Sequence, residues 1–316
     1  MAYRLKISEK PAAGLVRIAE EQTARLADLD TGARQRRAYV HETRKGLKRL
    51  RALLRLLAEH ADKHALAAEQ DRLRDLGRLL AGERASTVLP DTLVALAAEC
   101  ELDEEAVNAC RRALNELDME APPTGGADVD AEITAGLAEF NRALPHLAEG
   151  LDIGALVSAV GLAYERGRAD LDRAYSDPGP ESFHDLRKRV QLHWRHCQIL
   201  ARSWPDAFAA RITAARELSG VLGRENDLTE FCQWLMAARG EALTVAVADR
   251  LLARALERRD ELRAEARPLA RRLFAERRGA LERRFKAYWR AAVDTRRTAK
   301  KRQRGTVAPR PVRTVH

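Results

Sequence analysis

Aromatic residues are scarce in this chain of 316 residues and make up only 5% of it. Aromatic and β-branched residues are the ones that favour strands, so their scarcity argues against a β-sheet fold. Long uncharged runs are also missing, because no stretch approaches the roughly 18 apolar residues that cross a bilayer. We therefore expect no contact with a membrane.

Cysteine is also rare, and the four residues (Cys100, Cys110, Cys197 and Cys232) form neither a C-x-x-C motif nor a zinc-type spacing. The first ten residues lack the apolar run of a signal peptide. These features predict reduced core thiols in a cytoplasmic protein. They also give no reason to expect a metal site or a cofactor.

Helix-forming residues dominate instead. The chain is 46% hydrophobic, which excludes a disordered chain, and 33% charged, with Ala, Leu, Arg and Glu most frequent. The apolar periodicity is helical almost throughout and predicts an all-α fold. We expect helices at about 9–29, 33–60, 65–82, 91–100, 104–117, 131–149, 154–175, 181–203, 206–223, 227–239, 241–265 and 268–294.

Proline is expected to mark several of these boundaries. Pro205 and Pro268 are expected to begin helices, where a missing N–H does no harm, and Pro90 to separate two helices. Pro145 is expected to kink or end its helix.

The net charge of +9 is concentrated at one end of the chain. Residues 296–316 carry eight Lys or Arg and no acid, which leaves +1 for residues 1–295. We expect this basic segment to be a disordered tail that binds nucleic acid non-specifically. Any specific anion site in the body must therefore rest on local clustering.

Such clusters are present. Residues 34–55 hold nine Lys or Arg against Glu42, and residues 186–205 hold five and no acid. Residues 91–139 are the reverse, with thirteen acids against two arginines, while residues 254–290 hold thirteen cations and six acids. A charge distribution this uneven concentrates anions at particular faces.

The first cluster has a helical register. Its basic residues, spaced 4, 3, 4, 3 and 4 apart, would lie in one stripe about 27 Å long, formed by Arg37, His41, Arg44, Lys48, Arg51 and Arg55. An apolar stripe with the same period precedes it by one residue, about 100° around the helix, so the cations flank the buried face. Like charges at this spacing repel, which favours an external polyanion as their partner. A solvated face, or pairing with the acids around 99–105, is the alternative.

The chain also contains a repeat. Residues 40–51 read VHETRKGLKRLR and residues 183–194 read FHDLRKRVQLHW, 143 positions later. A related pair of segments, 79–84 and 221–227, follows each motif at a similar distance. This predicts two homologous antiparallel helical bundles, about 8–149 and 150–295, related by a pseudo-twofold axis.

These motifs resemble the CHAD family, whose name stands for conserved histidine α-helical domain. The resemblance implies a single domain over 8–295, with a basic central groove or pore that binds inorganic polyphosphate, and association with polyphosphate granules. It gives as candidate contacts His41, Arg44, Lys45, Lys48, Arg49 and Arg51 in the first half, and His184, Arg187 and Lys188 in the second. The charge pattern adds Arg37 and Arg55 in the first half, and Arg195 and Arg202 in the second.

The match to the family pattern is incomplete in one place. Ala85 follows Arg84 where Asp227 follows Asn226, so the first half lacks one acid that would orient its histidine helix. The two histidines of the motif are expected either to donate to phosphate or to be satisfied within the bundle. The Glu-x-Glu-x-Lys signature of an adjoining triphosphatase domain is missing, so we expect a non-catalytic module. Two alternatives stay open, non-specific nucleic-acid binding and a scaffold that docks an acidic protein.

Overall fold

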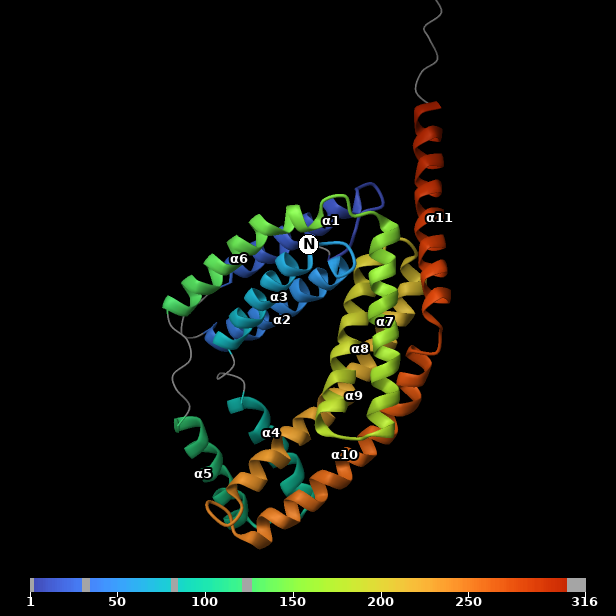
Figure 1. Ribbon diagram of the computed structural model, residues 1–316. Helices are drawn as coiled ribbons and strands as arrows, with labels where there is room; N and C mark the ends of the chain where they lie inside the picture. Colours follow the sequence, from blue (N-terminus) through green and yellow to red (C-terminus); the bar gives the residue numbers. More distant parts are fainter. Residues whose placement is uncertain (1–2, 30–34, 81–84, 121–126, 306–316) are drawn as a thin grey trace, which may run out of the picture.

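The computed structural model describes residues 3–29, 35–80, 85–120 and 127–305. Within these ranges the chain forms α-helices and no β-strand, which confirms the predicted all-α class (Figure 1). The helices are α1 Pro11–Ala27, α2 Arg36–Leu54 with the short 3-10 helix η2 Arg55–Leu57, α3 Lys63–Leu79, α4 Ala85–Glu99, α5 Glu104–Glu120, α6 Ala127–Ala148, α7 Ile153–Ser176, α8 Pro180–Leu200, α9 Pro205–Ala238, α10 Val245–Leu273 and α11 Arg278–Gly305.

Local sequence signals set many of the helix starts. The carboxylates of Asp62 and Asp152 accept hydrogen bonds from the first free N–H groups of α3 and α7, and Thr244 does the same for α10. Pro180 and Pro205 occupy the first positions of α8 and α9, where no N–H is needed.

Four predicted breaks are absent, because burial outweighs local propensity. The helix α9 continues through 224–226 with buried residues along its whole length. Pro268 lies inside α10 instead of beginning a helix, and the break falls after Leu273. Pro90 and Pro145 also lie inside helices, α4 and α6. Phe140, Leu144 and Ala148 stay fully buried on both sides of Pro145, so core packing offsets the lost backbone hydrogen bond.

The helices pack in two groups that meet at an angle (Figure 1). In the first group, α1 packs on α2 and α6, and α3 packs on α2 and α6. In the second group, α7 to α10 pack in sequence, and α11 runs along α7. The pair α4 and α5 crosses over, because α4 packs on α9 and α10. The predicted half 8–149 therefore does not close on itself.

The two groups are joined where α2 crosses α8. The Nε2 atom of His196 donates to the carbonyl oxygen of Ala52 over 3.0 Å, and both residues are buried. The N-terminal segment seals this joint, since the backbone N–H of Leu5 donates to the carbonyl of Ile199 over 2.9 Å. The hydroxyl of Tyr3 also donates to the carbonyl of Arg49 over 2.7 Å. The N-terminal segment thus contacts both helices.

The C-terminal basic segment differs from its prediction. The helix α11 continues to Gly305, so residues 296–305 are helical where we expected disorder. The remainder of that segment, 306–316, lies outside the described residues. Among the described residues, no single helix is long and apolar enough to span a bilayer, and only α6 and α7, bent by 111°, pass a test of length and composition as a pair.

The joint predicts a pH dependence of stability. Burial lowers the pKa of His196 from 6.5 to about 4. As pH falls from 6.5 towards 4, the histidine is protonated in the unfolded chain but stays neutral in the folded chain. The free energy of unfolding therefore decreases over this window by about 3 kcal/mol. His196→Gln keeps a donor for Ala52 and is expected to flatten the dependence of the unfolding free energy on pH between 6.5 and 4, measured by urea denaturation.

An exposed histidine gives the control. His64 lies on the surface of α3, so His64→Gln is expected to leave the pH profile unchanged. Equal profiles for wild type and His196→Gln would show that the histidine at the joint is not responsible.

Candidate functional site

The two predicted stripes of α2 face different surroundings. The apolar stripe is buried along its whole length, from Val40 and Thr43 to Leu54 and Leu57. Of the basic stripe, His41, Lys48, Arg51 and Arg55 are exposed and Arg44 is half-buried. The predicted register is confirmed for these residues.

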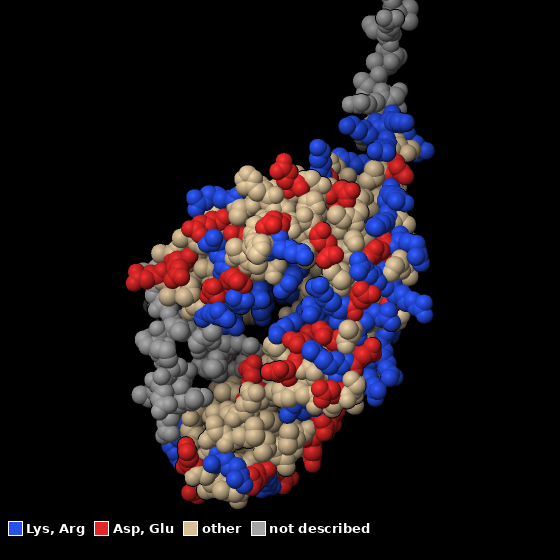
Figure 2. Space-filling model, viewed as in Figure 1, with Lys and Arg blue, Asp and Glu red and all other residues tan. Residues whose placement is uncertain are grey.

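The basic edge of α2 meets cations from three other helices. The charges that repel Arg55 are those of Arg189 of α8, Arg51, and Arg166 of α7, and Arg74 of α3 repels Arg51. We call Arg51, Arg55, Arg74, Arg166 and Arg189 the arginine cluster. Figure 2 shows Lys and Arg side chains gathered around a hollow between the α1–α3 group and the α7–α9 group.

The electrostatic environment of the cluster is unfavourable to its own charges. Burial is the main cause that lowers the pKa of Arg51 and of Arg55, and the neighbouring guanidinium groups lower it further. Both side chains still reach solvent. They therefore lie in a hollow, where the surrounding protein displaces water from one side of the charge and solvent contacts the other.

Carboxylates compensate only part of the cluster. Arg189 pairs with Asp170 over 2.7 Å, and Arg74 pairs with Asp71 over 3.0 Å. In the ranges that the structure describes, no carboxylate lies within ion-pair distance of Arg51, Arg55 or Arg166. Among the described residues, no acid of another helix neutralises Arg51 or Arg55, as the alternative expectation would require.

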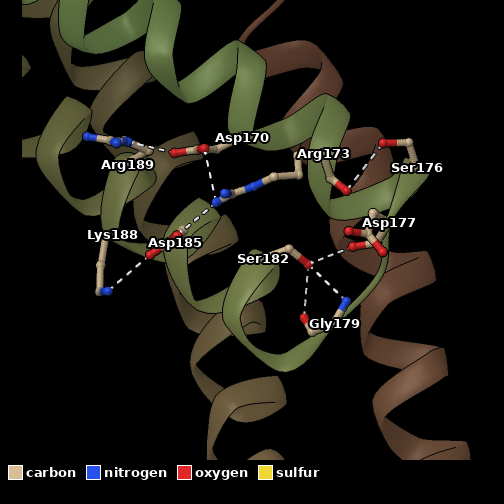
Figure 3. A network of polar contacts seen from close by, with 9 residues as sticks. All are labelled: Asp170, Arg173, Ser176, Asp177, Gly179, Ser182, Asp185, Lys188 and Arg189. Atoms are coloured by element: carbon tan, nitrogen blue, oxygen red, sulfur yellow. Dashed lines mark hydrogen bonds and ion pairs between the residues drawn. The ribbon is translucent and has the colours of Figure 1, made fainter.

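In the second half, Arg173, Lys188 and Arg189 are held in ion pairs (Figure 3). Lys188 contacts Asp185 over 3.0 Å, Asp185 contacts Arg173 over 2.8 Å, and Arg173 contacts Asp170 over 3.3 Å. This alternating chain of charges ends at Arg189 and ties α7 to α8. The charges of the second half are thus more fully compensated than Arg51 and Arg55.

The histidine of the second motif is positioned by α9. Nδ1 of His184 lies 2.6 Å from Oδ1 of Asn226, whose Nδ2 donates to Glu230 over 2.8 Å. Because that amide oxygen only accepts, Nδ1 of His184 donates, and Nε2 is the ring nitrogen that remains for a ligand. In the sequence repeat, the counterpart of the Asn226 segment in the first half falls within residues 81–84, which lie outside the described residues.

The arginines of the two motifs occupy corresponding places. Arg44 donates from Nη1 to the carbonyl of Leu80 over 2.7 Å. The guanidinium of Arg187 lies against Gly223, where an added Cβ would stand 3.6 Å from Nη2. Each arginine thus contacts the segment that follows its own motif in the sequence repeat.

Other predicted residues lie away from the arginine cluster. Lys45 pairs with Glu42 over 2.9 Å, and Arg49 donates to Gln22 of α1 over 3.2 Å. Arg195 is only 9% exposed and donates to the carbonyl of Gln191, so its prediction as a contact for a polymer is wrong. Arg202 is exposed just beyond the end of α8. Arg37 lies in the first turn of α2, but its side chain is outside the described residues.

Sequence reasoning also missed three members of the cluster, Arg74, Arg166 and Arg189. Arg74 and Arg189 have acids near them in sequence or in a neighbouring helix, and Arg166 stands between Glu165 and Arg168 on α7. No linear pattern distinguishes them, because the packing of α3, α7 and α8 places them beside α2. All four cysteines are free and buried, as predicted. Among the described residues no group of three or more His, Cys, Asp or Glu is placed to hold a metal ion.

Comparison with known proteins settles the family, because the CHAD domain model matches residues 17–236. The chain belongs to the CHAD family. A solved structure, PptA from Streptomyces chartreusis, resembles this CHAD protein with a TM-score of 0.58 and 18% sequence identity, over 84% of this chain and 98% of that one. That likeness concerns the fold. No curated protein matches the chain.

The cluster predicts a stabilising substitution. Arg55→Gln removes repulsion with Arg51, Arg166 and Arg189 and leaves no carboxylate without a partner. It is expected to raise the melting temperature by about 1–2 °C, measured by calorimetry without anions.

Arg189→Gln is the matched control within the same cluster. It removes a cation but leaves Asp170 without its 2.7 Å partner, so the melting temperature is expected to fall. An equal fall for Arg55→Gln would contradict the uncompensated state of Arg55.

Proposed function

We propose that this CHAD protein binds inorganic polyphosphate in a basic groove between α2 with η2 and α7 with α8. One observation carries the proposal: Arg51 and Arg166 lie close enough to Arg55 to repel its charge, and none of the three has a carboxylate partner among the described residues. Such an arrangement is costly in the free protein and favourable once an anion occupies the hollow. The family assignment supports the same ligand.

Polyphosphate suits this arrangement because it is a flexible chain with about one charge per phosphate. It has no base edges to read, so recognition rests on charge density and backbone shape. Arginine grips phosphate oxygens with two parallel hydrogen bonds, and released counterions contribute much of the binding free energy. His184 lies beside Arg187, and its Nδ1 already donates to Asn226, so its Nε2 donates to a phosphate only when the imidazole carries its second proton.

We also propose the pseudo-twofold relation of the two halves. Shifted by 143 residues, α2 falls on α8, and these helices contact each other. The same shift places α4 and α5 on the second part of α9 and on α10, and α4 packs on both. Contacts between equivalent elements are what an axis through the α2–α8 crossing requires. The two motif helices then meet at the axis, and the cations of the groove come mainly from α2, because Gln191, Trp194 and Gln198 of α8 stand where α2 has Lys48, Arg51 and Arg55.

The protein is further proposed to be a non-catalytic, cytoplasmic binding module on polyphosphate granules. Hydrolysis of a phosphoanhydride usually needs a metal ion held beside the cations. Release of orthophosphate from polyphosphate in the presence of Mg²⁺ or Mn²⁺ is the direct test, and we expect none above the rate without protein.

The binding prediction concerns three arginines together. Replacement of Arg51, Arg55 and Arg166 by Ala is expected to weaken polyphosphate binding at least tenfold and to reduce the slope of log K against log salt by about 2 to 3, one contact for each arginine. Isothermal titration at several salt concentrations measures both quantities.

The control removes the same charge elsewhere. Arg283, Arg290 and Arg296 are exposed on α11, and their replacement by Ala is expected to change the affinity less than threefold. Equal losses in the two triple variants would mean that net charge, and not the groove, sets the affinity. Unchanged affinity in the groove variant would sink the proposed site.

The choice between polyphosphate and nucleic acid rests on competition. A single-stranded DNA of equal total charge is expected to displace polyphosphate only at a large molar excess, because a sugar separates its successive phosphates and its charge density along the chain is lower. Displacement at equal charge would favour the non-specific nucleic-acid alternative.

A further inference from the structure

A second cationic pocket lies outside the proposed groove, between the start of α9, the end of α10 and α11. Its volume is about 460 Å³, within the range of small-molecule sites. The lining residues are Ala207, Phe208, Ala210, Arg211, Ala214, Arg272, Leu273, Arg284, Phe285 and Tyr288. No member of the arginine cluster lines it.

The charge in the pocket is only partly compensated. Three arginines line it, and Glu276 pairs with two of them, Arg211 and Arg284. Arg272 is exposed and has no partner among the described residues. Nε of Arg284 is buried and also has no hydrogen-bond partner there. The pocket therefore carries excess positive charge and an unused buried donor, which together call for an anion of two charges.

Arg211 lines the pocket but does not bind the ligand, because its guanidinium is already hydrogen-bonded within the protein. Its Nε donates to Nε2 of His193 over 2.9 Å, Nη1 to Glu276 over 3.1 Å, and Nη2 to the carbonyl of Leu273 over 3.1 Å. Burial is the main cause that holds the pKa of His193 well below 6.5, so the imidazole stays neutral and accepts. Arg272 and Arg284 are left as the groups that reach an anion.

Apolar side chains from α9 and α11 form the rest of the pocket. Ala207, Ala210 and Ala214 present only methyl groups from α9, and the ring of Tyr288 stands on α11. Phe208 and Phe285, with ring centroids 4.8 Å apart, are buried beneath. A slot between small methyl groups and an aromatic ring accepts a flat ring, which an isolated phosphate does not supply.

We propose that this pocket binds a mononucleotide, with the phosphate on Arg272 and Arg284 and the base between Tyr288 and the alanines of α9. The dianionic phosphate matches the excess charge, and the base matches the apolar slot. This site is separate from the proposed polyphosphate groove and does not depend on it.

The test uses the full chain with Arg51, Arg55 and Arg166 replaced by Ala, so that the groove does not compete for phosphate. Isothermal titration with AMP, GMP, CMP and UMP is expected to show binding of at least one of them, with adenosine and inorganic phosphate each at least tenfold weaker. If none of the four binds at concentrations up to about 5 mM, the proposal is overturned, since the Kd for each would then lie above the millimolar range. Phosphate that binds as tightly as the nucleotides would also overturn it, because the site would then recognise the anion alone.

Two variants place the binding in this pocket. Arg272→Gln is expected to weaken nucleotide binding at least tenfold, and Ala210→Phe, which fills the slot from an exposed position, is expected to abolish it. Both variants leave polyphosphate binding unchanged when made in the wild-type groove, which also shows that they fold. Nucleotide binding that survives both substitutions would assign it to another surface.

Discussion

The structure depends on the packing of α2, which buries one face and places cations directly beside it. The buried leucines of α2 hold the helix against its neighbours, and they fix Arg51 and Arg55 within reach of Arg166 and Arg189. Hydrophobic burial stabilises this arrangement by far more than the repulsion costs, because each buried leucine contributes on the order of 2 kcal/mol. The fold can therefore keep like charges together without an internal counterion.

The two halves use this arrangement differently. In the first half the cations at the end of α2 lack acids, whereas in the second half Asp170 and Asp185 link Arg173, Lys188 and Arg189 into one chain of ion pairs. The more exposed pairs of this chain, such as Lys188 with Asp185, contribute little to stability and exchange readily with another anion. Under the proposed function, a polyanion meets Arg51, Arg55 and Arg166 at once, and it reaches Lys188 and Arg189 only by replacing the carboxylates that already hold them.

The sequence was sufficient for features that depend on local order. The helical class, the register of the two stripes on α2 and the free buried cysteines follow from spacing and composition. Features that depend on packing were out of reach. Pro268 looked like a helix start because its ring suits that position, yet the buried residues on both sides keep α10 continuous. Arg195 carried the expected charge, but it is buried beside Tyr3 of the N-terminal segment. That segment has no periodic pattern from which its position on α8 could be predicted.

The crossing of α4 onto α9 and α10 has an evolutionary consequence. Under the proposed pseudo-twofold relation, the elements in contact are copies of the same hairpin, so the surface meets itself as in an isologous dimer. A protein with a single ancestral repeat would have exposed that surface to solvent. Two identical chains could have buried it by packing their copies of the surface against each other. Gene duplication and fusion would then have joined an existing homodimer into one polypeptide, after which the two copies were free to diverge in charge.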